Sequence, residues 1–116
     1  MKAQFGLTQV RRVLGPQHPA TLAAINSLAW LLATCLDSKV RDGQTALRLA
    51  EEVVAATGRT NAKDLDTLAA AHAELRQFDK AVSVQQEAIA LLDAEQNKQS
   101  FESRLRLYQS GSPVRE

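Results

Sequence analysis

The chain has 116 residues, of which 45% are hydrophobic and only 4% are aromatic. This length is enough for one domain that buries roughly two thirds of the surface its unfolded form would expose. The formal net charge of +1, with 14 basic and 13 acidic residues interspersed, gives no field that would indicate nucleic acid or an anionic membrane as a partner.

The cysteine content and the apolar runs indicate a reducing, aqueous compartment. Cys35 is the only cysteine, so no internal disulfide can form, and its apolar helical neighbourhood predicts a buried, reduced thiol. No apolar run reaches the ~18 to 20 residues of a membrane span, and residues 1–15 lack the apolar core of a secretory signal. We therefore expect a soluble cytoplasmic protein, unless a longer parent chain carries a signal.

Residues 2–14 form the first predicted helix, and Gly15 and Pro16 end it. No helix precedes it to complete a hairpin. Apolar side chains on its open side, among them Phe5 and Val13, would then form an uncovered patch that favours self-association. Its inward stripe consists of Ala3, Leu7, Val10 and Leu14.

The next two predicted helices form a hairpin over residues 19–58. The first, residues 19–36, carries Ile25, Leu28, Ala29 and Leu32 at helical spacing. The second runs from about residue 42 to residue 57, with Asp42 as N-cap and Gly58 as the C-terminal stop. The charged segment 37–42 between them is predicted to be an exposed, lengthened turn.

Residues 61–93 repeat this arrangement. The spacing Ile25-x2-Leu28-Ala29-x2-Leu32 recurs as Leu65-x2-Leu68-Ala69-x2-His72, and a break at residues 76–79 precedes the partner helix. That helix has an inward stripe of Ala81, Val84, Ala88 and Leu91. Small residues at Ala69 and Ala81 indicate that the two helix axes approach closely.

The end of the chain is predicted to form a capping helix, residues 97–109, followed by a tail, residues 110–116. Residues 97–109 form a polar helix whose one stripe consists of Phe101, Leu105 and Tyr108, as expected for the helix that covers the last apolar face of a stacked array. Residues 110–116 contain Gly111 and Pro113 and are expected to be a flexible tail. The predicted fold class is all-α, with antiparallel helical hairpins stacked as a short solenoid and closed by a C-terminal capping helix.

The repeated pattern resembles the tetratricopeptide repeat, W-x2-L-G-x2-Y followed by A-x3-F and a closing proline. His72, Gln85 and Asp93 stand at the tyrosine, phenylalanine and proline places. The stretch RRVLGPQHPATLAAINSLA, residues 11–29, is similar to the linker and next repeat of kinesin-light-chain-type tetratricopeptide proteins. The resemblance covers about residues 10–93. It implies that residues 1–15 are the second helix of a truncated repeat, in the C-terminal part of a longer, bacterial-type array.

No pattern of catalytic or ligand-binding residues supports an enzyme. The sequence has neither phosphate-loop glycines nor a metal-ligand cluster, so we expect no cofactor and no metal. Cys35 with His18 or His72 is the only pairing of a nucleophile with a base. His72 is better explained as a core-edge residue, and His18 as a helix cap or a solvated side chain.

In a stacked array of this kind the first helices of successive repeats line a concave groove. The resemblance implies that Asn26 holds peptide backbone, although Ser27 and Thr67 depart from the family's asparagine pair. Trp30 offers a large rigid contact, and burial against residues 2–14 is an equal alternative for it. The candidate peptide-binding residues are Asn26, Trp30, Thr34, Lys63, Asp66, Thr67, Ala70 and Glu74.

The function expected from these observations is a non-catalytic protein-interaction module that binds a peptide or partner segment. The alternative is a structural segment that mediates self-association through the open N-terminal end. An appendage of an enzyme ranks behind both.

Overall fold

The structure is a computed structural model that describes the chain over residues 2–93 and 98–116, and its side chains over residues 6–93 and 98–116. In this part of the chain every regular element is a helix and no strand occurs, so the all-α prediction is confirmed. The helices are α1 (Lys2–Leu14), α2 (Pro19–Thr34), α3 (Gly43–Thr57), α4 (Ala62–Glu74), α5 (Phe78–Ala90) and α6 (Lys98–Gln109).

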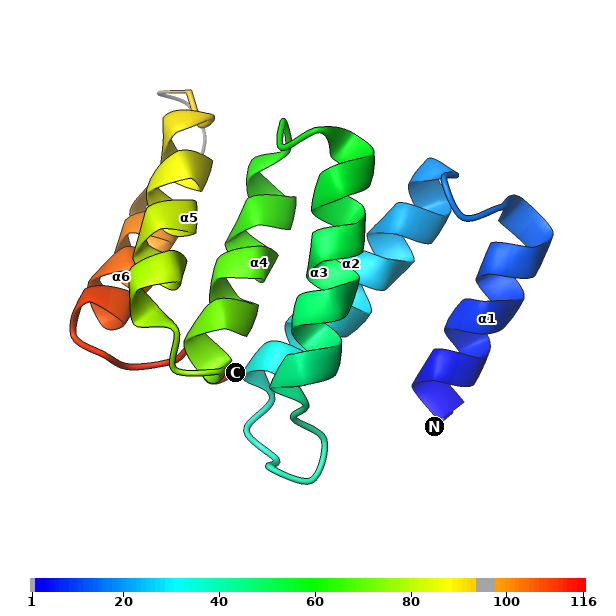
Figure 1. Ribbon diagram of the computed structural model, residues 1–116, viewed down its shortest axis with the longest axis horizontal. Helices are drawn as coiled ribbons and strands as arrows, with labels where there is room; N and C mark the ends of the chain where they lie inside the picture. The colour runs from blue at the N-terminus through cyan, green and yellow to red at the C-terminus, as the bar shows by residue number, and fades with distance from the viewer. Residues whose placement is uncertain (1, 94–97) are drawn as a thin grey trace.

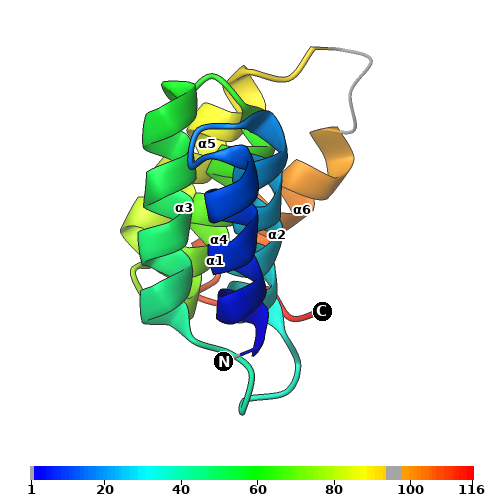
Figure 2. The same cartoon turned by 90° about the vertical axis from the view of Figure 1, so that its right-hand side faces the viewer.

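Each helix packs against the next one along the chain, and α2 also packs against α4. The pairs α2/α3 and α4/α5 form hairpins that stand side by side, with α1 at one end and α6 at the other (Figure 1). Seen along the stack, α3 and α5 lie toward one side and α2 and α6 toward the other (Figure 2). Helices α2, α4 and α6 share one face of the stack. The candidate groove residues were predicted on two of these helices, α2 and α4.

Helix starts follow from side chains that accept otherwise unpaired backbone N–H groups. His18 Nδ1 accepts from Ala20 N–H, and Asn61 Oδ1 accepts from Lys63 N–H. Asp42 caps α3, where the hydroxyl and the backbone N–H of Thr45 both donate to its carboxylate. These hydrogen bonds hold the pKa of Asp42 below its ordinary value.

Small side chains occupy the helix crossings. Stripes of alanine on the packed faces of α2, α3, α4 and α5 are fully buried, which lets neighbouring helix axes approach closely. Gly43 marks another close approach, since a Cβ there would lie 2.9 Å from Cδ2 of Leu75. The fully buried alanines of the stripes are Ala29, Ala46, Ala50, Ala69, Ala81 and Ala88.

The connection between α2 and α3 begins two residues earlier than predicted, because α2 ends at Thr34. Cys35 is the C-cap residue and is half-buried, so the prediction of a buried thiol is only partly met. The segment 36–39 is exposed, as expected for an inserted turn. Arg41 holds this turn against α4, with Nε 3.4 Å from a carboxylate oxygen of Glu74.

Helix α1 covers one end of the stack. Leu7 is buried, Val10 is half-buried and Leu14 is 43% exposed, so the predicted inward stripe is wrong at Leu14. Leu14 is the last residue of α1, and no described helix covers that end. Val13 is 79% exposed, as predicted. The side chains of Ala3 and Phe5 lie outside the described residues.

The C-terminal region differs most from the sequence-based expectation. Helix α6 packs on α5 and buries Tyr108, as expected of a cap. The chain then reverses at Gly111, which has a positive φ of 77°. Instead of leaving the surface, residues 112–116 run back along the stack to the end of α2 (Figure 1).

Candidate functional site

A hollow of about 480 Å³ opens on the face shared by α2, α4 and α6. Five of the eight predicted groove residues line it: Asn26, Trp30, Lys63, Asp66 and Thr67. Trp30 is half-buried in its wall, so the indole takes part in the hollow. Two helices that are far apart in the sequence therefore contribute to one site.

The other three predicted residues do not line the hollow. Thr34 is buried and its hydroxyl donates to the Trp30 carbonyl at 2.7 Å. Ala70 is buried in the core, because its side of α4 faces neighbouring helices. Glu74 lies at the end of α4, where it forms ion pairs with Arg41 and Arg115.

Arg104 of α6 connects the two sides of the hollow. Its Nε donates to Asp66 Oδ1 at 2.8 Å. The guanidinium carbon lies 5.0 Å from the Phe101 ring centroid and 5.5 Å from the Trp30 ring centroid. A guanidinium between two aromatic rings and a carboxylate is held by cation–π attraction as well as by charge. Arg104 thus fixes the rim of the hollow.

Asp66 is a buried carboxylate at the base of this cluster. Its Oδ1 accepts a second hydrogen bond from Gln85 Nε2 at 3.0 Å, and the same Nε2 donates to the Phe101 carbonyl at 3.0 Å. Burial raises the pKa of Asp66, and the hydrogen bond and charge of Arg104 offset this only in part. Gln85 therefore joins three helices at the position where the repeat pattern has phenylalanine.

Asn26 and Lys63 contribute polar side chains to the hollow. Asn26 Oδ1 is buried without a hydrogen-bond partner among the described residues, although the residue lines the hollow. An amide with an unused acceptor is costly unless something pairs with it. Lys63 is exposed at the N-terminal end of α4, beside Asp66 and Thr67 in the wall.

Five residues that line the hollow were not among the predicted groove residues, namely Ser27 of α2 and four residues of the C-terminal region. Ser100, Phe101 and Arg104 come from α6, and Glu116 comes from the final segment. The sequence assigned α6 to capping and residues 110–116 to a free tail. The one sequence feature that could have indicated their part in the hollow was the spacing of Phe101 and Arg104. It places the two side chains one turn apart on the same helix.

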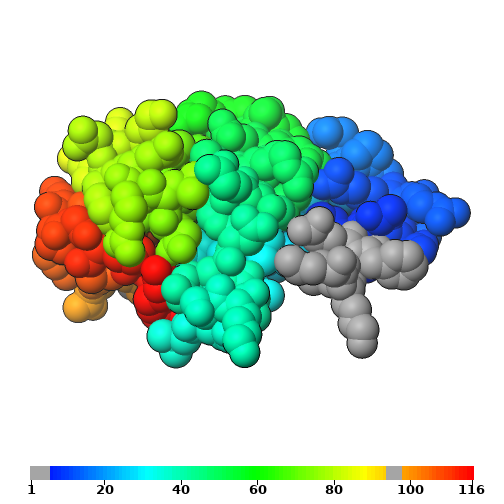
Figure 3. All heavy atoms as spheres, turned by 60° about the horizontal axis from the view of Figure 1, so that its bottom comes forward, coloured from blue at the N-terminus to red at the C-terminus, as the bar shows by residue number. Residues whose placement is uncertain are grey.

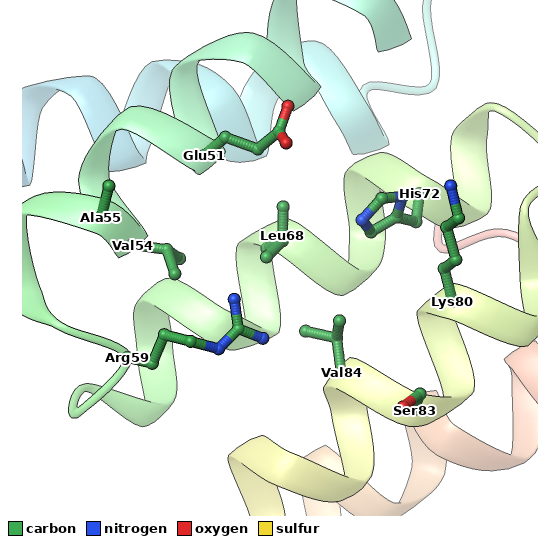
Figure 4. Close-up of a pocket in the computed structure, with 9 residues that line it drawn as sticks. All are labelled: Glu51, Val54, Ala55, Arg59, Leu68, His72, Lys80, Ser83 and Val84. Carbon is green, nitrogen blue, oxygen red and sulfur yellow. The ribbon is translucent and has the colours of Figure 1, made fainter.

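A second hollow of about 410 Å³ lies between α3, α4 and α5, as Figure 4 shows. Arg59 extends toward Leu68 and Val84 in this view, and its guanidinium forms an ion pair with Glu87 at 2.6 Å. His72 borders the same hollow and is hydrogen-bonded to Gln77 at 2.8 Å. Arg59 is thus paired within the protein, whereas the charged side chains of Glu51 and Lys80 are exposed at the edge.

Of the two pairings of a nucleophile with a base, that of Cys35 with His18 is ruled out by distance. His18 caps the start of α2 and Cys35 caps its end, so the helix holds them about 26 Å apart at roughly 1.5 Å per residue. Within residues 2–93 and 98–116, no three His, Cys, Asp or Glu side chains gather as metal ligands would. None of the helices described is both long and apolar enough to cross a membrane.

Comparisons of the chain with protein-family models, with curated proteins and with solved structures found no match.

Proposed function

We propose that this chain is a non-catalytic protein-interaction module of the tetratricopeptide type, which binds an extended peptide segment on the face of α2, α4 and α6. The proposed compartment is the cytoplasm, where its only cysteine would stay reduced. The resemblance of residues 10–93 to tetratricopeptide repeats supports the class of protein. The hollow supports the location of the site.

The observation that carries this proposal is the convergence of Asn26, Trp30 and Lys63 in one hollow. An aromatic anchor, a side-chain amide and an exposed cation are the groups that hold an extended peptide by its side chains and backbone. No covalent chemistry is required of any of them.

The test is a selection of peptides from a random display library against the full chain, followed by affinity measurements on single variants. We expect peptides that lose at least tenfold in affinity with Asn26→Ala and with Lys63→Glu. The matched control is Lys80→Glu, the same charge reversal at an exposed lysine that borders the second hollow. If no peptide is enriched, or if binding is lost only with Lys80→Glu, the proposed site is refuted.

The alternative, self-association through the N-terminal end, is favoured by the exposed pair Val13 and Leu14. Helix α1 packs on α2, and Arg11 of α1 forms an ion pair with Glu52 of α3 at 3.1 Å. Sedimentation velocity over a hundredfold dilution series tests it. Concentration-dependent association that Val13→Glu reduces would support this function, and a monomer at every concentration would exclude it.

A further inference from the structure

The segment 112–116 lies on the same face as the proposed peptide site. From Gly111 it passes the end of α4 and reaches the connection after α2, where it is seated beside the turn that precedes α3 (Figure 3). Glu116 also lines the hollow, next to Trp30. The segment and the hollow are therefore parts of one continuous surface.

The backbone of the segment is held by two hydrogen bonds to α2 and its C-cap region. Glu116 N–H donates to the Thr34 carbonyl at 2.8 Å, and Leu36 N–H donates to the Glu116 carbonyl at 3.1 Å. The Thr34 carbonyl belongs to the last turn of α2, where carbonyl groups have no partner within the helix. The end of α2 thus offers one acceptor and one donor to an extended chain.

Three successive side chains complete the attachment. Val114 is only 6% exposed, Arg115 Nη2 lies 2.8 Å from Glu74 Oε1, and Glu116 Oε2 accepts from Trp30 Nε1 at 3.0 Å. The order is apolar, basic, acidic. Each side chain has its own counterpart on the protein. A peptide-binding site recognises a specific sequence through such separate contacts with successive side chains.

We infer that residues 112–116 are an internal ligand: the end of α2 and Glu74 recognise an extended segment with an apolar, a basic and an acidic residue in succession, and a partner protein binds by displacing the tail with such a segment. This inference rests on the proposed function. A short tether gives the internal segment an effective concentration on the order of millimolar, so a partner must compete with it.

Arg115→Glu in the full chain tests this by placing a like charge beside Glu74. Trp30 is the only tryptophan, so its fluorescence emission reports loss of the Glu116 contact. We expect the emission to change in Arg115→Glu and to stay near that of wild type in Arg115→Lys, which keeps a positive charge beside Glu74. Unchanged emission in Arg115→Glu would overturn the inference.

The second arm titrates an amidated peptide, SGSPVRE, with the sequence of residues 110–116 into both chains. We expect saturable binding to Arg115→Glu that is at least tenfold tighter than to wild type, and no binding of a scrambled peptide of equal composition. Absence of peptide binding to Arg115→Glu would overturn the inference. So would a dimer of this variant in sedimentation, because the tail would then be exchanged between copies.

The two proposals fail separately. If library peptides still bind in the Lys63-dependent manner while the tail peptide does not, only the internal-ligand inference is overturned. If neither the library peptides nor the tail peptide binds, both proposals are overturned.

Discussion

Replacing Gln85 by leucine removes the residue that joins α4, α5 and α6. Gln85 has 0% of its surface exposed, and its Nε2 donates to Asp66 Oδ1 and to the Phe101 carbonyl, both at 3.0 Å. Leucine has a similar size and no donor. The substitution therefore leaves a carboxylate and a carbonyl each short of one hydrogen bond in a buried place.

The expected loss follows from the type of each bond. A hydrogen bond to a charged group contributes about 1.5 to 3 kcal/mol and one to a neutral carbonyl about 0.5 to 1.5 kcal/mol. Burying leucine in place of an amide returns about 1 to 2 kcal/mol, and this gain includes the removal of Gln85 Oε1, which is buried without a hydrogen-bond partner among the described residues. The free energy of unfolding should fall by about 2 kcal/mol, the centre of a range of about 0 to 3.5 kcal/mol. Each kcal/mol corresponds to roughly 4 °C in Tm at this chain length.

Urea unfolding followed by far-ultraviolet circular dichroism measures this change. Gln86→Leu is the matched control, since Gln86 is the exposed neighbour on the same helix and its replacement should stay within about 0.5 kcal/mol. If Gln85→Leu were as stable as wild type or more so, the bonds from Gln85 would contribute no more than packing does. The role of Gln85 in holding α4, α5 and α6 together would then be refuted.

Four further predictions concern single side chains. Ala69→Leu should lower the unfolding free energy by about 1 to 3 kcal/mol, because it overpacks a helix crossing. The same change at the exposed Ser83 should not. The reverse order of the urea midpoints would mean that the buried faces of α4 and α5 are misassigned. Because burial raises the pKa of Asp66 above its ordinary value of 3.8, the folded chain binds this proton more tightly than the unfolded chain. Stability therefore falls as pH rises from about 4 through the folded pKa, and Asp66→Asn should flatten this fall in urea midpoints measured across pH; parallel curves would contradict it. Tyr108→Phe should be neutral or stabilising by up to about 1 kcal/mol, because the buried hydroxyl has no partner among the described residues. A loss of unfolding free energy above about 1 kcal/mol in the same urea assay would show that the hydroxyl is paired. Cys35→Ala should leave peptide affinity unchanged, and loss of binding by a folded variant would give the thiol a functional role.

The sequence by itself determined the secondary structure and most of the core. Apolar spacing at Leu65, Leu68 and Ala69 and at the matching positions of the first hairpin is a local property, and it repeats with the helical period. Capping residues such as Asp42 and Gly58 mark helix ends by local hydrogen bonding and backbone conformation. Five of the eight candidate groove residues followed from the same periodicity, because it fixes which face of a helix each side chain occupies.

Only the tertiary structure decided what covers that face. The contacts of Arg104 with Asp66 and of Glu116 with Trp30 join residues 38 and 86 positions apart in the sequence. No local periodicity encodes such pairs. A tail that contains glycine and proline has no helical or strand pattern, so the sequence predicts a free end. Its position is set instead by a burial site for Val114, a carboxylate for Arg115 and backbone partners at the end of α2, all of which exist only once the helices have packed.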